Sequence, residues 1–399
     1  MAAEKQMDPQ ILKKGRALCP SFGRCGGCSY LGMSDEEQLA VKEREVLKCL
    51  SASGIDTSVY KGIVKAPSSF AYRNKMEFTF GNEVKDGPTI LGLHAKKSFI
   101  SIVPADCCVL VPEDFRKLLR ATQEFCLSRA YTHYNKKSHA GLLRGLVLRR
   151  GVRTNELLVN IVTSSQGDFD ENGYLEMIRS MDTESAIVGV LHTVNDNRSD
   201  AVVAEDVRVL YGRQYYNEQI LGLNFKVGAF SFFQTNVEAA ERLYRDAVGL
   251  IPSLENKTVF DLYCGTGTMT QAMALKASRA IGVEIVEEAV ETAREAAKIN
   301  GLDNCEFIAG DVGKVLAELS AVPDVIMVDP PRPGIAPKAL QQILSYGVEN
   351  IIYVSCNPKT LAENLRSAAL LCYKPISITA YDNFSYTKHI ESIAHLVKV

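Results

Sequence analysis

Hydrophobic and polar residues follow three different patterns along the chain. After Ser34, apolar residues recur at helical spacing, and Ser34 with Glu37 forms a capping box, which predicts a helix beginning there. Residues from about 72 to 216 show short strand-like runs, interrupted by a helical stretch at 113–129, and predict a β-rich domain with an antiparallel sheet. From about residue 253, apolar strands alternate with helices, which predicts a doubly wound α/β sheet.

These patterns predict four parts of the chain. Residues 1–34 form an irregular, cysteine-rich segment, and a helix within 35–70 packs on the C-terminal domain. The β-rich domain covers 71–216 and the α/β domain covers 217–399. In the α/β domain we expect strands at residues 258–263, 279–284, 305–308, 324–328, 350–355 and 373–380, and a last one at 390–397.

The composition is that of an ordinary globular protein, with 46% hydrophobic and 23% charged residues among 399. Because no run of 18 apolar residues and no apolar signal core occur, we expect a cytoplasmic protein without a membrane span. Eleven cysteines then favour free thiols, a metal or a cluster over disulfides. No feature indicates an obligate protein partner.

The formal net charge of −2 gives no sign of nucleic acid for the whole chain, but one stretch is strongly basic. Residues 133–153 contain no acid and carry Lys136, Lys137, Arg144, Arg149, Arg150 and Arg153. This stretch is either a local RNA-binding face or a solvated strand face. If it is one continuous strand, Arg144 and Arg150 share one face, and Arg149 and Arg153 share the other.

A glycine-containing loop follows the first strand of the α/β domain. Gly265 and Gly267 allow a tight turn that brings backbone close to a ligand at a helix N-terminus. Glu284 ends the next strand, where a carboxylate accepts hydrogen bonds from ribose hydroxyls, and Asp311 after the third could bind an adenine amino group. The third glycine of a dinucleotide fingerprint is missing, so S-adenosylmethionine fits better than a dinucleotide. The alternative is an ordinary tight turn.

Two later strands end in reactive groups. Asp329 follows the strand at 324–328, and Cys356 follows the strand at 350–355, immediately before a helix. Both would emerge at one edge of the sheet, where such sheets bind ligands. A helix N-terminus can lower the pKa of a thiol, which would make Cys356 a nucleophile. The alternative is that Cys356 is a small buried residue, as most cysteines are.

At this point the chain resembles the RNA uridine C5-methyltransferases, which act on 23S rRNA or on the T-loop of tRNA. The resemblance covers nearly the whole chain and rests on five motifs in order: Tyr72-Arg73-Asn74-Lys75, Phe233-Gln234-x-Asn236, Asp329-Pro330-Pro331-Arg332-x-Gly334, Ser355-Cys356-Asn357-Pro358 and His389-Ile390-Glu391.

The resemblance implies a role for each matched residue. Cys356 would add to C6 of uracil, and Glu391 would remove the C5 proton after methyl transfer. The residues that would contact S-adenosylmethionine are Gln234, Tyr263, Glu284 and Asp329, with Asp311 a further candidate. By sequence alone, Glu391 would be read as a surface strand acid.

The N-terminal cysteines complete the resemblance. Cys19, Cys25 and Cys28, with five and two residues between them, need a fourth ligand, which Cys107 or Cys108 offers. Members of the family with a [4Fe–4S] cluster share this spacing, and in them an apolar pair follows the distant ligand, as it follows Cys108. The resemblance therefore implies a [4Fe–4S] cluster on Cys19, Cys25, Cys28 and Cys108. Zinc is the alternative metal, because four thiolates also suit it.

The expected substrate is a uridine of 23S rRNA, with the tRNA T-loop as the alternative. A non-catalytic RNA-binding iron–sulfur protein and a base-amino methyltransferase are two further readings, and neither needs Cys356. Larger family members carry a small β-barrel RNA-binding domain before the cluster, whereas only residues 1–18 precede Cys19 here. We therefore expect the central domain to hold RNA, through Arg144, Arg149, Arg150 and Lys75.

Overall fold

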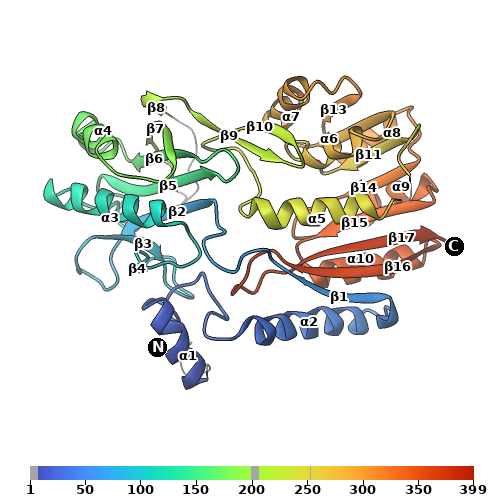
Figure 1. Ribbon diagram of the computed structural model, residues 1–399, viewed down its shortest axis with the longest axis horizontal. Coiled ribbons are helices and arrows are strands. Elements are labelled where there is room, and N and C mark those ends of the chain that lie inside the picture. The colour runs from blue at the N-terminus through green and yellow to red at the C-terminus, as the bar shows by residue number, and fades with distance from the viewer. Residues whose placement is uncertain (1–7, 199–205, 252) are drawn as a thin grey trace.

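The computed structural model describes residues 8–198, 206–251 and 253–399. Two β-sheets with their own helices make up most of it, and the hairpin of β9 (Tyr215–Ile220) and β10 (Leu223–Gly228) lies between them (Figure 1). The larger sheet has eight strands in the order β1-β16-β17-β15-β14-β11-β12-β13. The smaller sheet has seven, in the order β4-β3-β2-β5-β6-β7-β8.

The larger sheet is doubly wound, as predicted. Strands β13, β12, β11, β14 and β15 are parallel, β17 is antiparallel to β15 and β16, and β1 pairs in parallel with β16. After β11 the chain moves outward to β13 and then returns to β14 beside β11. Sheets of this kind bind ligands at that switch point. The strands are β1 (Tyr60–Lys65), β11 (Thr258–Leu262), β12 (Arg279–Glu284), β13 (Cys305–Ala309), β14 (Val325–Val328), β15 (Asn350–Ser355), β16 (Tyr373–Asp382) and β17 (Glu391–Lys398).

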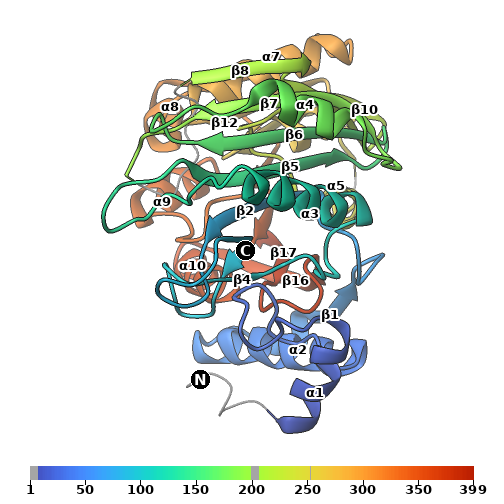
Figure 2. The same ribbon diagram turned by 90° about the vertical axis from the view of Figure 1, so that its left-hand side faces the viewer.

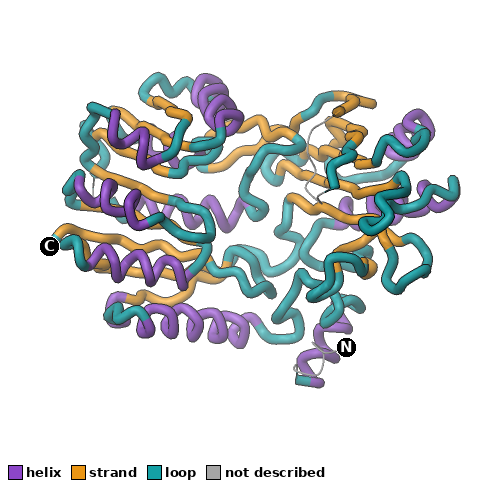
Figure 3. The backbone as a smooth tube through the Cα atoms, turned by 180° about the vertical axis from the view of Figure 1, so that it is seen from behind, coloured by secondary structure: helices purple, strands orange, loops and turns teal. Residues whose placement is uncertain are grey.

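Helices cover both faces of the larger sheet, which Figure 3 shows from behind. Val259 and Phe260 are neighbours on β11 and are both fully buried, in different hydrophobic clusters on opposite faces. A strand buried on both faces reads as a continuous apolar run, which explains why these strands were predictable. The helices are α2 (Asp35–Ala52), α5 (Val237–Gly249), α6 (Thr268–Ala274), α7 (Glu287–Ile299), α8 (Val312–Glu318), α9 (Pro337–Ser345) and α10 (Pro358–Ala369).

The smaller sheet is antiparallel with one exception. Strands β6 and β7 are parallel and are connected through α4 (Glu171–Arg179), so the expectation of a wholly antiparallel sheet is wrong at this pair. Together with α3 (Glu113–Ser128), α4 covers the side facing away from the larger sheet (Figures 1 and 2). The strands are β2 (Lys75–Gly81), β3 (Ile90–His94), β4 (Ile102–Pro104), β5 (Leu143–Gly151), β6 (Glu156–Thr163), β7 (Ala186–Val194) and β8 (Asp206–Gly212).

The N-terminal region is more regular than predicted. A helix, α1 (Pro9–Leu18), occupies part of the segment expected to be irregular, with Asp8 as its N-cap and proline at its first position. The capping box of Ser34 and Glu37 is present at the start of α2. Residues 57–59 form a short 3₁₀ turn before β1, an edge strand that was not predicted. No helix within the described ranges is long and apolar enough to cross a lipid bilayer.

Candidate active site

A cavity of about 890 Å³ lies at the carboxyl ends of the parallel strands, at the switch point of the larger sheet. Residues at the ends of strands β11 to β17 and from the segment before α5 line it. The predicted site residues on its wall are Gln234, Tyr263, Gly265, Glu284, Asp311, Asp329, Cys356 and Glu391. Segments separated by more than 150 residues in the sequence thus meet at one place.

The loop between β11 and α6 turns through left-handed backbone conformations. Tyr263, Gly265 and Gly267 have φ angles of 68°, 54° and 74°. Gly265 lines the cavity, but Gly267 has a packing role instead. A Cβ at Gly267 would lie 2.5 Å from the ring of Phe307, so the start of α6 can approach β13 only without a side chain here. Of the two glycines, Gly265 therefore faces the cavity and Gly267 allows a close contact between α6 and β13.

Strand-end carboxylates are held by backbone amides around this loop. Glu284 accepts hydrogen bonds from the amides of Gly265, at 3.1 Å, and Val286, at 3.0 Å. Asp311 caps α8 by accepting from the amide of Lys314 at 3.2 Å, and its side chain is exposed toward the cavity. Two acids on adjacent strands, beside a glycine turn, form an arrangement suited to ribose hydroxyls and a base amino group.

Two further acids lie deeper. Asp261, in the middle of an apolar strand, is 1% exposed and accepts a 2.6 Å hydrogen bond from the hydroxyl of Thr270. Burial raises the pKa of Asp261 to about 7, and burial with the nearby Asp261 raises the pKa of Asp329 to about 7. Asp261 was not among the predicted site residues, although a carboxylate between Phe260 and Leu262 in a buried strand is a recognisable signal. These acids make the cavity attractive to a cation.

Cys356 is half-buried on the cavity wall, after β15. The expectation that the following helix lowers its pKa is wrong. Burial, and then the charges of Glu391 and Asp329, raise the pKa of Cys356, against a smaller lowering by Arg332. Glu391 opens β17, and burial and Asp329 raise its pKa to about 8, whereas Arg332 and Lys42 lower it. The charges of Asp329 and Arg332 therefore act on both the Cys356 thiol and the Glu391 carboxyl.

Arg332 ties the three C-terminal motifs together. Its Nη2 lies 2.9 Å from Nδ1 of His389, and its carbonyl accepts from the Asn357 side chain at 3.0 Å and from the Thr360 hydroxyl at 3.2 Å. Burial and the cations around it, Arg332 first among them, lower the pKa of His389 to about 4. His389 is thus neutral near pH 7 and can accept from the guanidinium of Arg332. The motif residues hold each other in place.

The smaller domain also contacts the cavity wall. The side chain of Asn74 donates to the carbonyl of Gln234 at 3.1 Å, and its amide donates to the carbonyl of Thr235 at 3.0 Å. Asn236 donates to the carbonyl of Asn383 at 2.7 Å. The side chain of Gln234 donates to the Tyr244 hydroxyl at 2.8 Å. This segment before α5 therefore connects both sheets to the cavity. Asn383 and Phe384, which were not predicted as site residues, also line the cavity.

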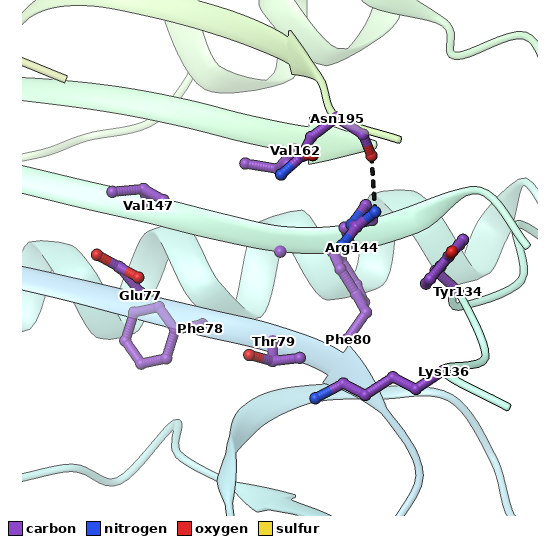
Figure 4. Close-up of a pocket in the computed structure, with 11 residues that line it drawn as sticks. Glu77, Phe78, Thr79, Phe80, Tyr134, Lys136, Arg144, Val147, Val162 and Asn195 are labelled. Atoms are coloured by element: carbon purple, nitrogen blue, oxygen red, sulfur yellow. Dashed lines mark hydrogen bonds between the residues drawn. The ribbon is translucent and has the colours of Figure 1, made fainter. Parts of the chain in front are cut away.

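The basic stretch does not form a flat face. Arg149 is 1% exposed and donates to the carbonyl of Ser231 at 2.7 Å, so its assignment to an RNA surface is wrong. A bulge between Leu143 and Gly145 interrupts the alternation of β5. Arg144 there donates to the carbonyl of Asn195 at 2.8 Å (Figure 4), and its guanidinium carbon lies 4.5 Å from the centroid of the Tyr134 ring.

The two other arginines of the stretch also form hydrogen bonds within the protein. Arg150 donates to the side chain of Asn155 at 3.0 Å, and Arg153, beyond the strand, donates to Glu241 at 3.1 Å. Arg144 and Arg150 line two different small cavities, so they do not form a single patch. The predicted pairing of the four arginines on two faces is therefore wrong. Arg149 is buried, and the other three bind nearby groups of the protein.

The N-terminal cysteines are neighbours of one another. Cys28 lies close enough to Cys108, Cys25 and Cys19 that each charge would raise the pKa of the Cys28 thiol, after burial as the main cause. Cys108 is buried, and burial raises its pKa to about 11, whereas Cys107 is exposed and lies next to Asp106. Within the described residues, no group of three or more His, Cys, Asp or Glu side chains is close enough to hold a metal ion.

The chain is similar to a known protein family and to several RNA methyltransferases. Residues 204–399 match the family model described as tRNA (Uracil-5-)-methyltransferase. An RNA methyltransferase of Clostridium tetani is 46% identical over 383 residues, covering 96% of this chain and 84% of that protein. Another, of Caldanaerobacter subterraneus subsp. tengcongensis, is 48% identical over 380 residues, covering 95% of this chain and 84% of the relative.

A solved structure is also similar. The Pyrococcus abyssi tRNA (uracil-54, C5)-methyltransferase in complex with S-adenosyl-L-homocysteine has a TM-score of 0.76 and 29% identity, over 92% of this chain and 84% of that chain. Fold and cavity thus define an enzyme of the S-adenosylmethionine-dependent class with a mixed α/β methyltransferase fold. The chain belongs to the family of S-adenosylmethionine-dependent RNA uracil-5-methyltransferases.

Proposed function

We propose that the enzyme methylates C5 of a uridine in RNA through a covalent adduct between Cys356 and C6. The observation that carries this proposal is the shared cavity of Cys356 and Glu391, at the ends of the neighbouring strands β15 and β17. Uracil C5 is a poor nucleophile until a group adds at C6. A thiol and a carboxyl facing the same space can provide the addition and the later proton removal.

The Cys356 thiol gives its proton to solvent, the sulfur bonds to C6, and the electron pair of the C5–C6 double bond moves toward the C4 carbonyl oxygen. Bound S-adenosylmethionine would supply the methyl group: its sulfonium–methyl bond breaks as C5 takes up the methyl group, and S-adenosyl-L-homocysteine is the leaving group. Glu391 next removes the remaining proton from C5, the double bond forms again, and the sulfur leaves C6 with the pair of electrons. Cys356 and Glu391 both lie on the cavity wall where these steps would occur.

We propose that Gln234, Tyr263, Glu284 and Asp329 contact S-adenosylmethionine, with Asp311 and the backbone of Gly265 completing its site. The residues fit the ligand, because the carboxylate of Glu284, held by backbone amides, can accept from ribose hydroxyls, and Asp261, Asp329 and Glu391 line the same cavity and can favour a sulfonium charge. A bound sulfonium would lower the pKa of Asp329 and Glu391, because a nearby positive charge favours the ionised form of a carboxyl. Binding of the donor would thereby help to ionise the proposed base.

For the target we propose a uridine of 23S rRNA, with the tRNA T-loop as the second candidate. The ordered motifs and cysteine spacing support the first, whereas the similarity to the Pyrococcus abyssi tRNA enzyme favours the second. Mapping of 5-methyluridine in rRNA and tRNA, from cells with and without the gene, tests both. A missing 5-methyluridine in one RNA identifies the target. Unchanged 5-methyluridine in both, with loss of a methylated base amino group, would reject the proposal.

We also propose that Cys19, Cys25, Cys28 and Cys108 hold a [4Fe–4S] cluster, with zinc as the alternative metal. Four thiols are the right donor set, and Cys25 already accepts a hydrogen bond from the amide of Gly27 at 3.3 Å, as cluster thiolates do. Cys108 is favoured over Cys107 because it is buried beside the other three. Metal binding would require these side chains to move closer together.

A further inference from the structure

A second cavity adjoins the active site at the boundary between the two sheets. It has a volume of about 210 Å³ and lies between the segment before β2, the end of β5 and the start of α5. This is room for about seven waters at roughly 30 Å³ each, yet below the range of roughly 300–1,000 Å³ typical of whole ligands. Its size suits one part of a larger ligand that continues outside.

One segment separates the two cavities. Asn236 lines the smaller cavity and donates to the carbonyl of Asn383, which lines the larger. Asn74 also lines the smaller cavity, and its side chain donates to the carbonyl of Gln234, which lines the larger. A polymer with its reacting unit beside Cys356 could therefore place an adjacent unit in the smaller cavity.

The side chains around the smaller cavity have the chemistry of a nucleotide site. Phe70 is 41% exposed, unusual for a large aromatic, and its ring centroid lies 5.2 Å from that of Tyr386. Arg73 and Arg150 line the same cavity. Arg73 uses Nε to donate to the carbonyl of Lys75 at 3.2 Å, and Nε of Arg150 is buried without a partner among the described residues. Exposed aromatic rings stack bases, and arginines bind the phosphate backbone.

A carboxylate argues against a simple anion site. Glu238, in the first turn of α5, also lines the cavity. Its negative charge opposes a free phosphate ion, but it can accept hydrogen bonds from a ribose hydroxyl or a base amino group. The cavity thus offers one ring for stacking, two cations and one acceptor. This set matches a nucleotide within an RNA chain better than it matches a free base, ribose or phosphate.

We propose that this cavity binds a nucleotide next to the target uridine, with its base against Phe70 and its phosphate near Arg73 and Arg150. The proposal rests on the proposed function, since it names a second contact of the same RNA substrate. Within the basic stretch, this leaves Arg150 as the arginine proposed to contact RNA, because Arg149 is buried and Arg144 is bonded to backbone carbonyls elsewhere. Stacking would hold the strand while the target base enters the larger cavity.

The first test measures binding of a short single-stranded RNA to the full protein, without S-adenosylmethionine, over a range of salt. Arg73→Gln and Arg150→Gln should each weaken binding and reduce the salt slope by up to about 0.7, the value for one single-strand phosphate. Arg279→Gln is the matched control, because Arg279 pairs with Glu306 at the opposite end of β12 from the cavity. Wild-type slopes in both cavity variants would overturn the proposal.

The second test concerns stacking. Phe70→Leu should bind the same RNA about 5- to 100-fold more weakly, whereas Phe70→Tyr should bind like the wild type, because a ring is needed for stacking. The affinity for S-adenosylmethionine should change less than about twofold in both variants. An equal loss of S-adenosylmethionine affinity in Phe70→Leu would show that the ring only supports the wall between the cavities.

The third test locates the contact. RNA with 4-thiouridine beside a uridine should crosslink under ultraviolet light to the peptide that contains Phe70. Crosslinks confined to other peptides would overturn the proposal. The outcomes separate this subsite from the catalytic proposal. RNA bound through the cavity, with no uridine methylated, would keep the subsite and reject the proposed function. If all cavity variants bind RNA and methylate it like the wild type, the subsite is rejected and the proposed function is kept.

Discussion

Cys356 and Glu391 both lie next to the last residue pair between the antiparallel strands β15 and β17. That pair is Ser355 with Ser392; Cys356 directly follows Ser355 and Glu391 directly precedes Ser392, and both line the cavity. Residues opposite each other in an antiparallel pair have Cα atoms roughly 4.5–5.5 Å apart. Because β17 runs antiparallel to β15, its first residue, Glu391, lies at the sheet edge where β15 ends and Cys356 follows. A parallel strand in this place would have its first residue at the other edge.

Replacement of the thiol tests covalency. Cys356→Ala should lose methylation by at least about a thousandfold, because the thiol that is proposed to add to C6 is gone. RNA with 5-fluorouridine at the target should form a denaturation-resistant complex with the wild type, since fluorine cannot leave as a proton does, and none with the variant. Cys264→Ala is a suitable control, because Cys264 lines the same cavity without a proposed role. Full activity in Cys356→Ala would reject the mechanism.

Replacement of Glu391 should separate addition from elimination. Glu391→Gln keeps the shape of the side chain but cannot take the C5 proton, so the methylated adduct should accumulate with unmodified RNA and S-adenosylmethionine. A protein–RNA band that survives denaturation, with turnover reduced about a hundredfold or more, is the expected result. Normal turnover in this variant would mean that water or another group removes the proton.

The pH dependence follows from the raised pKa of Glu391. Burial and the charge of Asp329 raise this pKa to about 8, so in the free enzyme the carboxyl is mostly protonated at pH 7 and becomes a base as the pH rises. The Cys356 thiol, whose pKa is also raised, must lose its proton in the same direction. We therefore expect kcat/KM to increase up to at least about pH 8. A profile that is flat between pH 6 and pH 9 would contradict this.

The C-terminal strands were predictable for a physical reason. Strands such as β14 and β15 are buried on both faces, so they appear as continuous apolar runs, and the polar residue that ends each run marks the sheet edge. Asp329 and Cys356 could be selected in this way. The family resemblance was needed for Glu391, since an acid at the start of a strand has no distinctive pattern.

Other features depend on distant contacts and were missed. The edge strand β1 is six residues long, contains Gly62, and pairs with β16, whose sequence lies more than 300 residues away. Arg149 was assigned to a surface because alternation predicts two faces but not what covers each. Here the face of Arg149 is covered by the hairpin and the loop around Ser231.

Metal analysis tests the N-terminal cysteines. Anaerobically purified protein should be brown and hold about four irons per chain, as a cubane with four thiolates requires. Cys108→Ser should lose most of this iron, whereas Cys107→Ser should keep it, because Cys108 is buried near Cys28 and Cys107 is exposed. The reverse pattern would move the fourth ligand to Cys107. One zinc per chain and no iron, under the same conditions, would replace the cluster with the alternative metal.

A buried ion pair beneath the cavity gives a last prediction. Lys42 on α2 and Asp382 at the end of β16 are both fully buried and form an ion pair, and Lys42 also donates to the carbonyl of Phe384 at 3.1 Å. The amides of Ser29 and Tyr30, next to Cys28, both donate to the carbonyl of Tyr386. The turn between β16 and β17 is thus fixed from α2 and from the cysteine segment, and it carries cavity residues Asn383 and Phe384.

Lys42→Met should therefore lower the free energy of unfolding by about 3–5 kcal/mol, because it leaves the Asp382 carboxylate buried without its cationic partner. The double variant Lys42→Met/Asp382→Asn should recover part of this loss, since no buried charge remains. Lys65→Met is the matched control: Lys65 also pairs with an aspartate, Asp35, but is 48% exposed, and surface pairs contribute little. Urea unfolding measures stability, and binding of S-adenosylmethionine reports on the cavity. If Lys42→Met and Lys65→Met unfold at the same urea concentration, the buried pair does not support the turn.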